Sequence, residues 1–319
     1  MSDLTPNTSS SVRPFSSEEP AVTVPSFRPP VSPEDQTIFF PHAQGTPPPE
    51  PPVRIPHLGH AALFLAIAGA ILLLIQLLFL GFNHPPAIGA KGAAGAMSPK
   101  FLVGSEALSY LATLALSWFI FPLLWKRPFP KGIQANLDAA RRNALRLIPI
   151  GLILSVTVQA ISSLISLPKN IPMDDFFRTP SDVWLVAAFG TLLAPLFEEV
   201  LFRGFLLPGF AIAYDWLSLP RTQAAREQWR SNNKLTRPSL VFSAVLTSIL
   251  FAALHGQQTA FTWPVLLLLF CVSLILSYAR LRLRSVMAST LIHVSYNATI
   301  FAFLFVVTGG FRHLDKIAH

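Results

Sequence analysis

Long apolar stretches separated by short basic segments dominate the chain from residue 59 onward. A helix needs about 20 predominantly apolar residues to cross the hydrocarbon core of a bilayer. The pattern predicts an all-α, polytopic transmembrane bundle of about seven spans. These are Ala61–Phe82, Ala107–Trp125, Leu147–Leu167, Val183–Leu207, Leu240–Leu254, Phe261–Tyr278 and Val286–Thr308.

The first 58 residues have a different composition. They hold 14 of the chain's 29 prolines, together with Ser, Thr and scattered charges. Proline fixes φ and removes a backbone donor, and the segment has too little apolar surface to build a core. We therefore expect residues 1–58 to be a disordered, Pro-rich tail.

Composition and charge agree with a membrane protein. Only 13% of the residues are charged and mean hydropathy is +0.51, whereas a soluble domain carries about 25% charged residues. The net charge of +8 gathers in the second-to-third, fourth-to-fifth and sixth-to-seventh loops. This bias indicates a cytoplasmic N-terminus, and not a nucleic-acid partner. Cys271 is the only cysteine, which excludes a disulfide framework and a thiolate metal cluster.

Two adjacent carboxylates, Glu198 and Glu199, lie inside the fourth apolar stretch. Each costs roughly 3 kcal/mol at the centre of a bilayer, so such residues are retained where they are paired, hydrated or functional. Arg203 lies one helical turn after Glu199, where the two can meet. Glu198 points about 100° away around the helix. One carboxylate is thus expected to be structural, which leaves the other free for chemistry.

Three more polar residues lie in or at the end of later spans. His255 ends the fifth, while His293 and Asn297 share a face of the seventh. A Glu, two His and an Asn suit amide hydrolysis, because a carboxylate takes a proton from water while imidazole and amide groups stabilise the oxyanion. Glu198, His255 and His293 could instead hold a divalent metal such as zinc. To match the depth of His255, the fourth helix would begin nearer Gly190 and run on to Tyr214.

The order of these groups forms three motifs: EExxxR at Glu198–Arg203, FxxxH at Phe251–His255 and HxxxN at His293–Asn297. On separate spans, over roughly residues 183–300, they resemble the CAAX protease and bacteriocin-processing family of intramembrane proteases. The resemblance implies that Glu198 activates water with His255 beside it, and that His293 and Asn297 stabilise the oxyanion. It also implies a supporting ion pair between Glu199 and Arg203. It leaves the need for a metal open.

We therefore expect an intramembrane endopeptidase of the bacterial plasma membrane, acting on a peptide or membrane-anchored protein. The expected divisions are a tail (1–58), N-terminal helices (59–181), a catalytic domain (182–310) and a C-terminal tail (311–319).

Two alternatives to a proteolytic function remain. One is a transporter or proton pathway, since intramembrane Glu and His also build relays. The other is a non-proteolytic scaffold or immunity factor.

Overall fold

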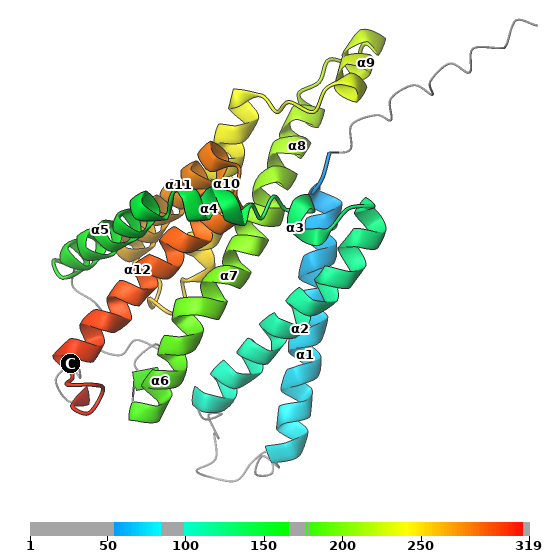
Figure 1. Ribbon diagram of the computed structural model, residues 1–319. Coiled ribbons are helices and arrows are strands. Elements are labelled where there is room, and N and C mark those ends of the chain that lie inside the picture. The colour runs from blue at the N-terminus through cyan, green and yellow to red at the C-terminus, as the bar shows by residue number, and fades with distance from the viewer. Residues whose placement is uncertain (1–53, 84–98, 166–175, 178, 315–319) are drawn as a thin grey trace, which may run out of the picture. The chain divides into compact units, whose positions relative to one another are not determined.

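A computed structural model describes residues 54–83, 99–165, 176–177 and 179–314. Every regular element in these ranges is a helix (Figure 1). Residues 1–53 of the expected Pro-rich tail, and residues 315–319 of the C-terminal tail, lie outside the described part.

Seven helical segments in the described part are long and apolar enough to cross a membrane, so the chain is an integral membrane protein. The fourth is the continuous stretch Pro180–Leu217. The others correspond to α1 (Leu58–Asn83), α2 (Pro99–Trp125), α5 (Ala144–Ser162), α10 (Arg237–Leu254), α11 (Trp263–Leu283) and α12 (Val286–Val307). The predicted all-α bundle of seven spans is therefore confirmed.

The fourth span is not a uniform α-helix. It passes through α6 (Pro180–Ala188), the π-helical segment η3 (Phe189–Leu193), α7 (Ala194–Glu199), the π-helical segment η4 (Val200–Leu206) and α8 (Leu207–Leu217). It starts at Pro180 because the Thr179 side chain accepts a hydrogen bond from Asp182 N–H and caps the helix. The expected start near Gly190 is therefore wrong, while the expected extension to Tyr214 is confirmed and the helix continues to Leu217.

Three short helices complete the described elements. The consecutive helices α3 (Phe129–Gly132) and α4 (Leu137–Arg142) connect α2 to α5, and α9 (Gln223–Ser231) lies between α8 and α10. The Asn136 side chain caps α4. The segment before α4 also bonds to the start of α12, because Val286 N–H donates to the Gln134 carbonyl at 3.1 Å.

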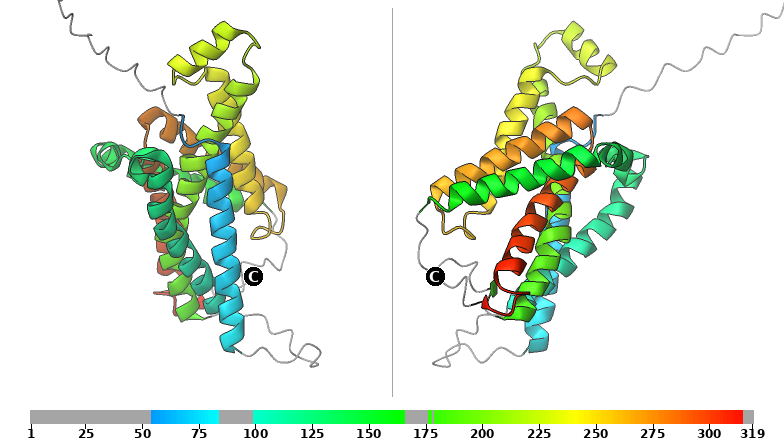
Figure 2. Two further views of the ribbon diagram at one scale, coloured as in Figure 1. Left: turned by 90° about the vertical axis from the view of Figure 1, so that its right-hand side faces the viewer. Right: turned by 60° about the vertical axis from the view of Figure 1, so that its left-hand side comes forward.

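Two packing features position the span that carries the adjacent carboxylates. Phe64 of α1 and Phe121 of α2 pack with Phe205 of η4, at ring-centroid distances of 4.6 Å and 4.9 Å from it. On another side, α5 packs along α12 (Figure 2). A Cβ added to Gly151 of α5 would lie 2.4 Å from the Ile292 carbonyl oxygen of α12. This close approach therefore requires glycine.

Candidate active site

A fully buried ion pair lies at the junction of α7 and η4. Arg203 Nη1 is 2.8 Å from Glu199 Oε1, and both side chains are 0% exposed. Arg203 Nη2 also donates to the Ser273 carbonyl at 3.0 Å and to Ser273 Oγ at 2.7 Å. His293 Nδ1 lies 3.1 Å from the same Glu199 oxygen. The pair therefore links the fourth span to α11 and α12.

A second arginine, Arg280 of α11, extends this network. Its Nε–H donates to the Arg203 carbonyl at 3.2 Å. Its two terminal nitrogens donate to Gln134 Oε1 at 3.0 Å and to the Ile133 carbonyl at 3.3 Å. Arg280 is 5% exposed. It thus fixes the α3–α4 connection against the same turn of the fourth span.

The π-helical register leaves specific carbonyls without helical partners. At the end of η3, the Ala194 N–H bonds to the Phe189 carbonyl, five residues back. The next position is Pro195, which has no N–H. The Gly190 carbonyl therefore loses both its α-type and its π-type partner. Asn297 Nδ2 supplies the missing donor at 2.6 Å.

The same arrangement recurs thirteen residues later, at the end of η4. The Leu207 N–H bonds to the Phe202 carbonyl, and position 208 is again proline. The Arg203 carbonyl is thereby freed, and it accepts the Arg280 Nε–H described above. Each π-segment thus exposes one carbonyl that a side chain from α11 or α12 satisfies. Short π-helical turns are frequent at functional sites.

Glu198 has a different environment from Glu199. Its side chain is 20% exposed and its Oε2 lies 3.8 Å from His293 Nε2, which is too long for a direct hydrogen bond. Glu198 Oε2 is buried and has no hydrogen-bond partner among the described residues. This carboxylate oxygen is available to accept a proton or a water hydrogen bond, whereas Glu199 is held by Arg203.

His255 is the first residue after α10, and its ring bonds back to its own helix. Nδ1 lies 2.8 Å from the Phe251 carbonyl. Since a carbonyl only accepts, we assign the proton to Nδ1, which leaves a lone pair on Nε2 in the neutral ring. The Phe251 ring lies 4.6 Å from the His255 ring and 5.9 Å from the His293 ring. Within the described residues, no hydrogen bond or ion pair joins His255 to Glu198.

A carboxylate that the sequence reasoning missed, Glu106 of α2, also faces this region. Tyr110 Oη donates to Glu106 Oε1 at 2.7 Å, and the Tyr110 ring stacks on Phe197 at 3.8 Å. Glu106 and Glu198 are close enough to repel each other electrostatically. The expected second span begins at Ala107, one residue after Glu106, whereas α2 begins at Pro99, so the cost of a carboxylate inside a span applies to Glu106 as well.

The donor set does not fit a three-ligand metal site. In the part of the chain that the structure describes, no three His, Cys, Asp or Glu side chains converge as a metal-binding group. The hypothetical set Glu198, His255 and His293 includes the 3.8 Å contact between Glu198 and His293, but nothing brings His255 onto the same point. A metalloprotease site is therefore not supported.

Comparison with known proteins agrees with the three motifs. Residues 180–299 match the family described as "Type II CAAX prenyl endopeptidase Rce1-like". This confirms the resemblance to the CAAX protease and bacteriocin-processing family, and supports a membrane protease in general. An Escherichia coli relative, "Uncharacterized 24.3 kDa protein", is 33% identical over 153 residues. The matched region covers 47% of this chain and 58% of that relative. No solved structure matches the chain.

Removing one member of the buried ion pair should be strongly destabilising. Arg203→Met leaves Glu199 charged and buried without its main partner, so we expect a loss of about 3–5 kcal/mol of stability. Adding Glu199→Gln removes the orphaned charge and should recover about half of that loss. Thermal unfolding in detergent measures both variants, with the exposed Glu227→Gln as control. Additive losses in the double variant would contradict the coupling.

A double-mutant cycle tests whether Asn297 compensates for Pro195. Asn297→Ala should cost about 1–3 kcal/mol, because the Gly190 carbonyl loses its donor. Pro195→Ala restores a backbone N–H at the π-type partner position. We therefore expect Asn297→Ala to cost about 1 kcal/mol less in the Pro195→Ala background, as measured by thermal unfolding. Ser295→Ala is the control, since among the described residues Ser295 Oγ donates only to the Leu291 carbonyl of its own helix. An equal cost in both backgrounds would refute the compensation.

Proposed function

We propose that the chain is an intramembrane endopeptidase that hydrolyses a peptide bond in or near the bilayer with water activated by Glu198. The match at residues 180–299 supports a membrane protease in general. The observation that carries the finer proposal is the contrast between two adjacent carboxylates. Arg203 and His293 hold Glu199 through its Oε1, although Glu199 Oε2 is also buried without a hydrogen-bond partner. In the described part of the chain no hydrogen bond holds Glu198, whose Oε2 is buried and without a partner.

In this mechanism Glu198 is the general base. It takes a proton from water as the water oxygen attacks the scissile carbonyl carbon. The Glu198 carboxylic acid then returns that proton to the leaving amine, which restores the carboxylate. The His255 Nε2 lone pair accepts a hydrogen bond from the same water and orients it. The Nδ1 contact with the Phe251 carbonyl supports this tautomer.

Asn297 and His293 stabilise the oxyanion. Asn297 uses one Nδ2–H for the Gly190 carbonyl, which leaves its second N–H for the substrate. His293 Nδ1 faces the Glu199 carboxylate, which accepts a hydrogen bond. Donation from Nε2 as well requires a proton on both ring nitrogens. His293 therefore acts as an imidazolium, whose charge is balanced by Glu198 and Glu199 within 4 Å.

No step of this mechanism runs through a metal ion, because the candidate ligands do not converge on one point in the described residues. Carboxylate, imidazole and amide groups supply the base, the orienting acceptor and the oxyanion donors. The Glu199–Arg203 pair acts as a brace that holds the helix backbone on which Glu198 lies.

The remaining expectations belong to the same proposal. We also propose the four divisions expected from the sequence, at 1–58, 59–181, 182–310 and 311–319; the family match over residues 180–299 supports a catalytic domain in the third. The basic bias of alternate loops supports a cytoplasmic N-terminus. The Escherichia coli relative supports a bacterial source, and the membrane spans then imply a location in the bacterial plasma membrane. The substrate is a peptide or a membrane-anchored protein.

Replacing the proposed base should abolish proteolysis without unfolding the protein. We expect Glu198→Gln to lower the cleavage rate by about 10²–10⁴-fold, the usual contribution of a general base. His255→Ala should also lower it, because the water loses its orienting acceptor. The measurement is cleavage of reporter peptides in proteoliposomes, including prenylated and unmodified C-terminal peptides, with and without chelator.

Glu106→Gln is the matched control, because it removes the same charge from a nearby carboxylate to which no chemical step is assigned. It should retain activity within about tenfold, well above the Glu198 variant. Equal activity in the wild type and Glu198→Gln would refute the assigned base. Loss of wild-type activity with chelator would show that the reaction requires a metal ion and would contradict the proposed metal-free mechanism.

A further inference from the structure

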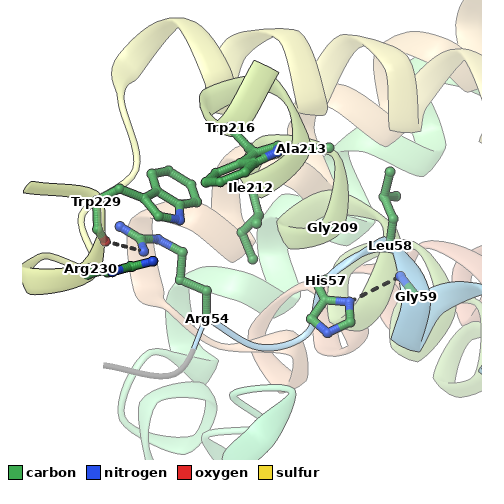
Figure 3. Close-up of a pocket in the computed structure, with 10 residues that line it drawn as sticks. All are labelled: Arg54, His57, Leu58, Gly59, Gly209, Ile212, Ala213, Trp216, Trp229 and Arg230. Carbon is green, nitrogen blue, oxygen red and sulfur yellow. Dashed lines mark hydrogen bonds between the residues drawn. The ribbon is translucent and has the colours of Figure 1, made fainter. Parts of the chain in front are cut away.

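A cavity apart from the candidate active site lies between the start of α1, the end of α8 and α9 (Figure 3). Its volume is about 460 Å³. None of its lining residues belongs to the candidate active site. They are Arg54, His57, Leu58, Gly59, Gly209, Ile212, Ala213, Trp216, Trp229 and Arg230.

Arg54 gives the cavity a positive charge that is not directly neutralised. Its Nη1 donates to the Trp229 carbonyl at 2.6 Å and its Nη2 to the Asn232 carbonyl, while the guanidinium lies 3.5 Å from the Trp229 ring centroid. Carbonyls and an indole satisfy donors without cancelling the charge. Burial lowers the pKa of Arg54 and nearby Asp215 raises it. The guanidinium nevertheless stays cationic at neutral pH.

Asp215, the carboxylate that acts electrostatically on Arg54, already accepts hydrogen bonds from other residues. Both Asp215 carboxylate oxygens accept hydrogen bonds from Thr236 and Ser239 at 2.5–2.9 Å. Arg230 is exposed and forms no ion pair within the described residues. Two of the five N–H groups of Arg54 are bonded to carbonyls and its Nε is buried, so the exposed Arg230 offers more free N–H donors to a ligand.

The other walls of the cavity are apolar and adjoin the membrane-crossing segments. Leu58 begins the first span and is 37% exposed, and Trp216, near the end of the fourth, is 48% exposed. Figure 3 shows Trp216, Ile212 and Arg54 turned toward the same space. Tryptophan is enriched where a span meets the polar interface. The cavity therefore joins a cationic end to an apolar one at the edge of the bilayer.

The charge around the cavity has a single dominant sign. Residues 218–237, which include α9, carry one acidic side chain, Glu227. The basic side chains of this segment are Arg221, Arg226, Arg230, Lys234 and Arg237. An anion is therefore favoured over a cation or a zwitterion at the polar end.

We propose that this cavity binds an anionic phospholipid, with the phosphate at Arg230 and Arg54 and an acyl chain along Leu58, Ile212 and Trp216. A free inorganic anion would gain nothing from the apolar wall, and a neutral amphiphile would gain nothing from the two arginines. The inference depends on the membrane spans and on the local charge, and it is independent of the proposed proteolytic activity.

Native mass spectrometry of the full-length protein in mild detergent tests the proposal. Phosphatidylglycerol and phosphatidylcholine with identical acyl chains are titrated separately. We expect phosphatidylglycerol to bind at least fivefold more tightly, and Arg230→Gln to reduce its affinity by about fivefold, the effect of one basic residue near an anionic headgroup. The matched control Arg226→Gln removes the same charge from α9 outside the cavity and should leave the affinity unchanged.

Trp216→Ala should lower the affinity for both lipids by similar factors, because it removes part of the apolar wall. Equal affinity for the two lipids in the wild type would overturn the anionic assignment. Equal losses of phosphatidylglycerol affinity in Arg226→Gln and Arg230→Gln would show that diffuse surface charge, and not this cavity, attracts the lipid. Displacement of phosphatidylglycerol by an equimolar concentration of inorganic phosphate would overturn the lipid assignment in favour of a free anion.

Discussion

The buried contact between Glu199 and Arg203 is the constraint on which the rest of the site depends. Moving a carboxylate and a guanidinium out of water costs several kcal/mol each, so the remaining donors and acceptors need partners. Ser273 of α11 accepts from Arg203 and His293 of α12 contacts Glu199, so both helices are bound to the fourth span. Arg203 Nε and Glu199 Oε2 have no hydrogen-bond partner among the described residues. Because Glu199 is held in this way, the adjacent Glu198 points away from Arg203 and keeps an oxygen without a partner.

The backbone of the fourth span also needs hydrogen-bond partners from other helices, at its two π-helical segments. In each, the register shifts by one residue and a proline occupies the position that would close the next bond, so one carbonyl is left free. Asn297 satisfies the first and Arg280 satisfies the second. A free carbonyl inside a membrane-spanning region is costly unless another helix supplies a donor. The register of the fourth span and the placement of α11 and α12 are thus interdependent.

This interdependence explains which features were predictable from the sequence. The seven spans follow from apolar length, and the Glu199–Arg203 contact follows from helical spacing, because both depend on local periodicity. The π-helical register could not be predicted from local periodicity. Pro195 and Pro208 are visible in the sequence, but the side chains that donate to the carbonyls left free beside them come from distant helices. The start at Pro180 was missed because Thr179 and Pro180 form a cap outside the most apolar stretch. Glu106 was not predicted because the expected second span begins one residue after it, whereas α2 begins at Pro99.

The proposed catalytic side chains differ in how far the geometry supports them. Glu198 and His293 face each other at 3.8 Å, and Asn297 bonds to the span that carries Glu198. His255 is linked to this group by ring contacts, because the Phe251 ring lies near both the His255 ring and the His293 ring. The motifs placed these groups on separate helices, whereas their mutual distances depend on how the helices pack.

The proposed activity of the chain is the cleavage of peptide bonds in or beside the bilayer. The most direct test compares all peptide termini in membranes from cells that carry either the wild-type protein or a folded, inactive Glu198 variant. The account predicts a set of new carboxyl termini within or next to membrane spans that occur with the wild type and are absent with the variant. Identical termini in the two membrane preparations, at equal protein levels, would contradict it.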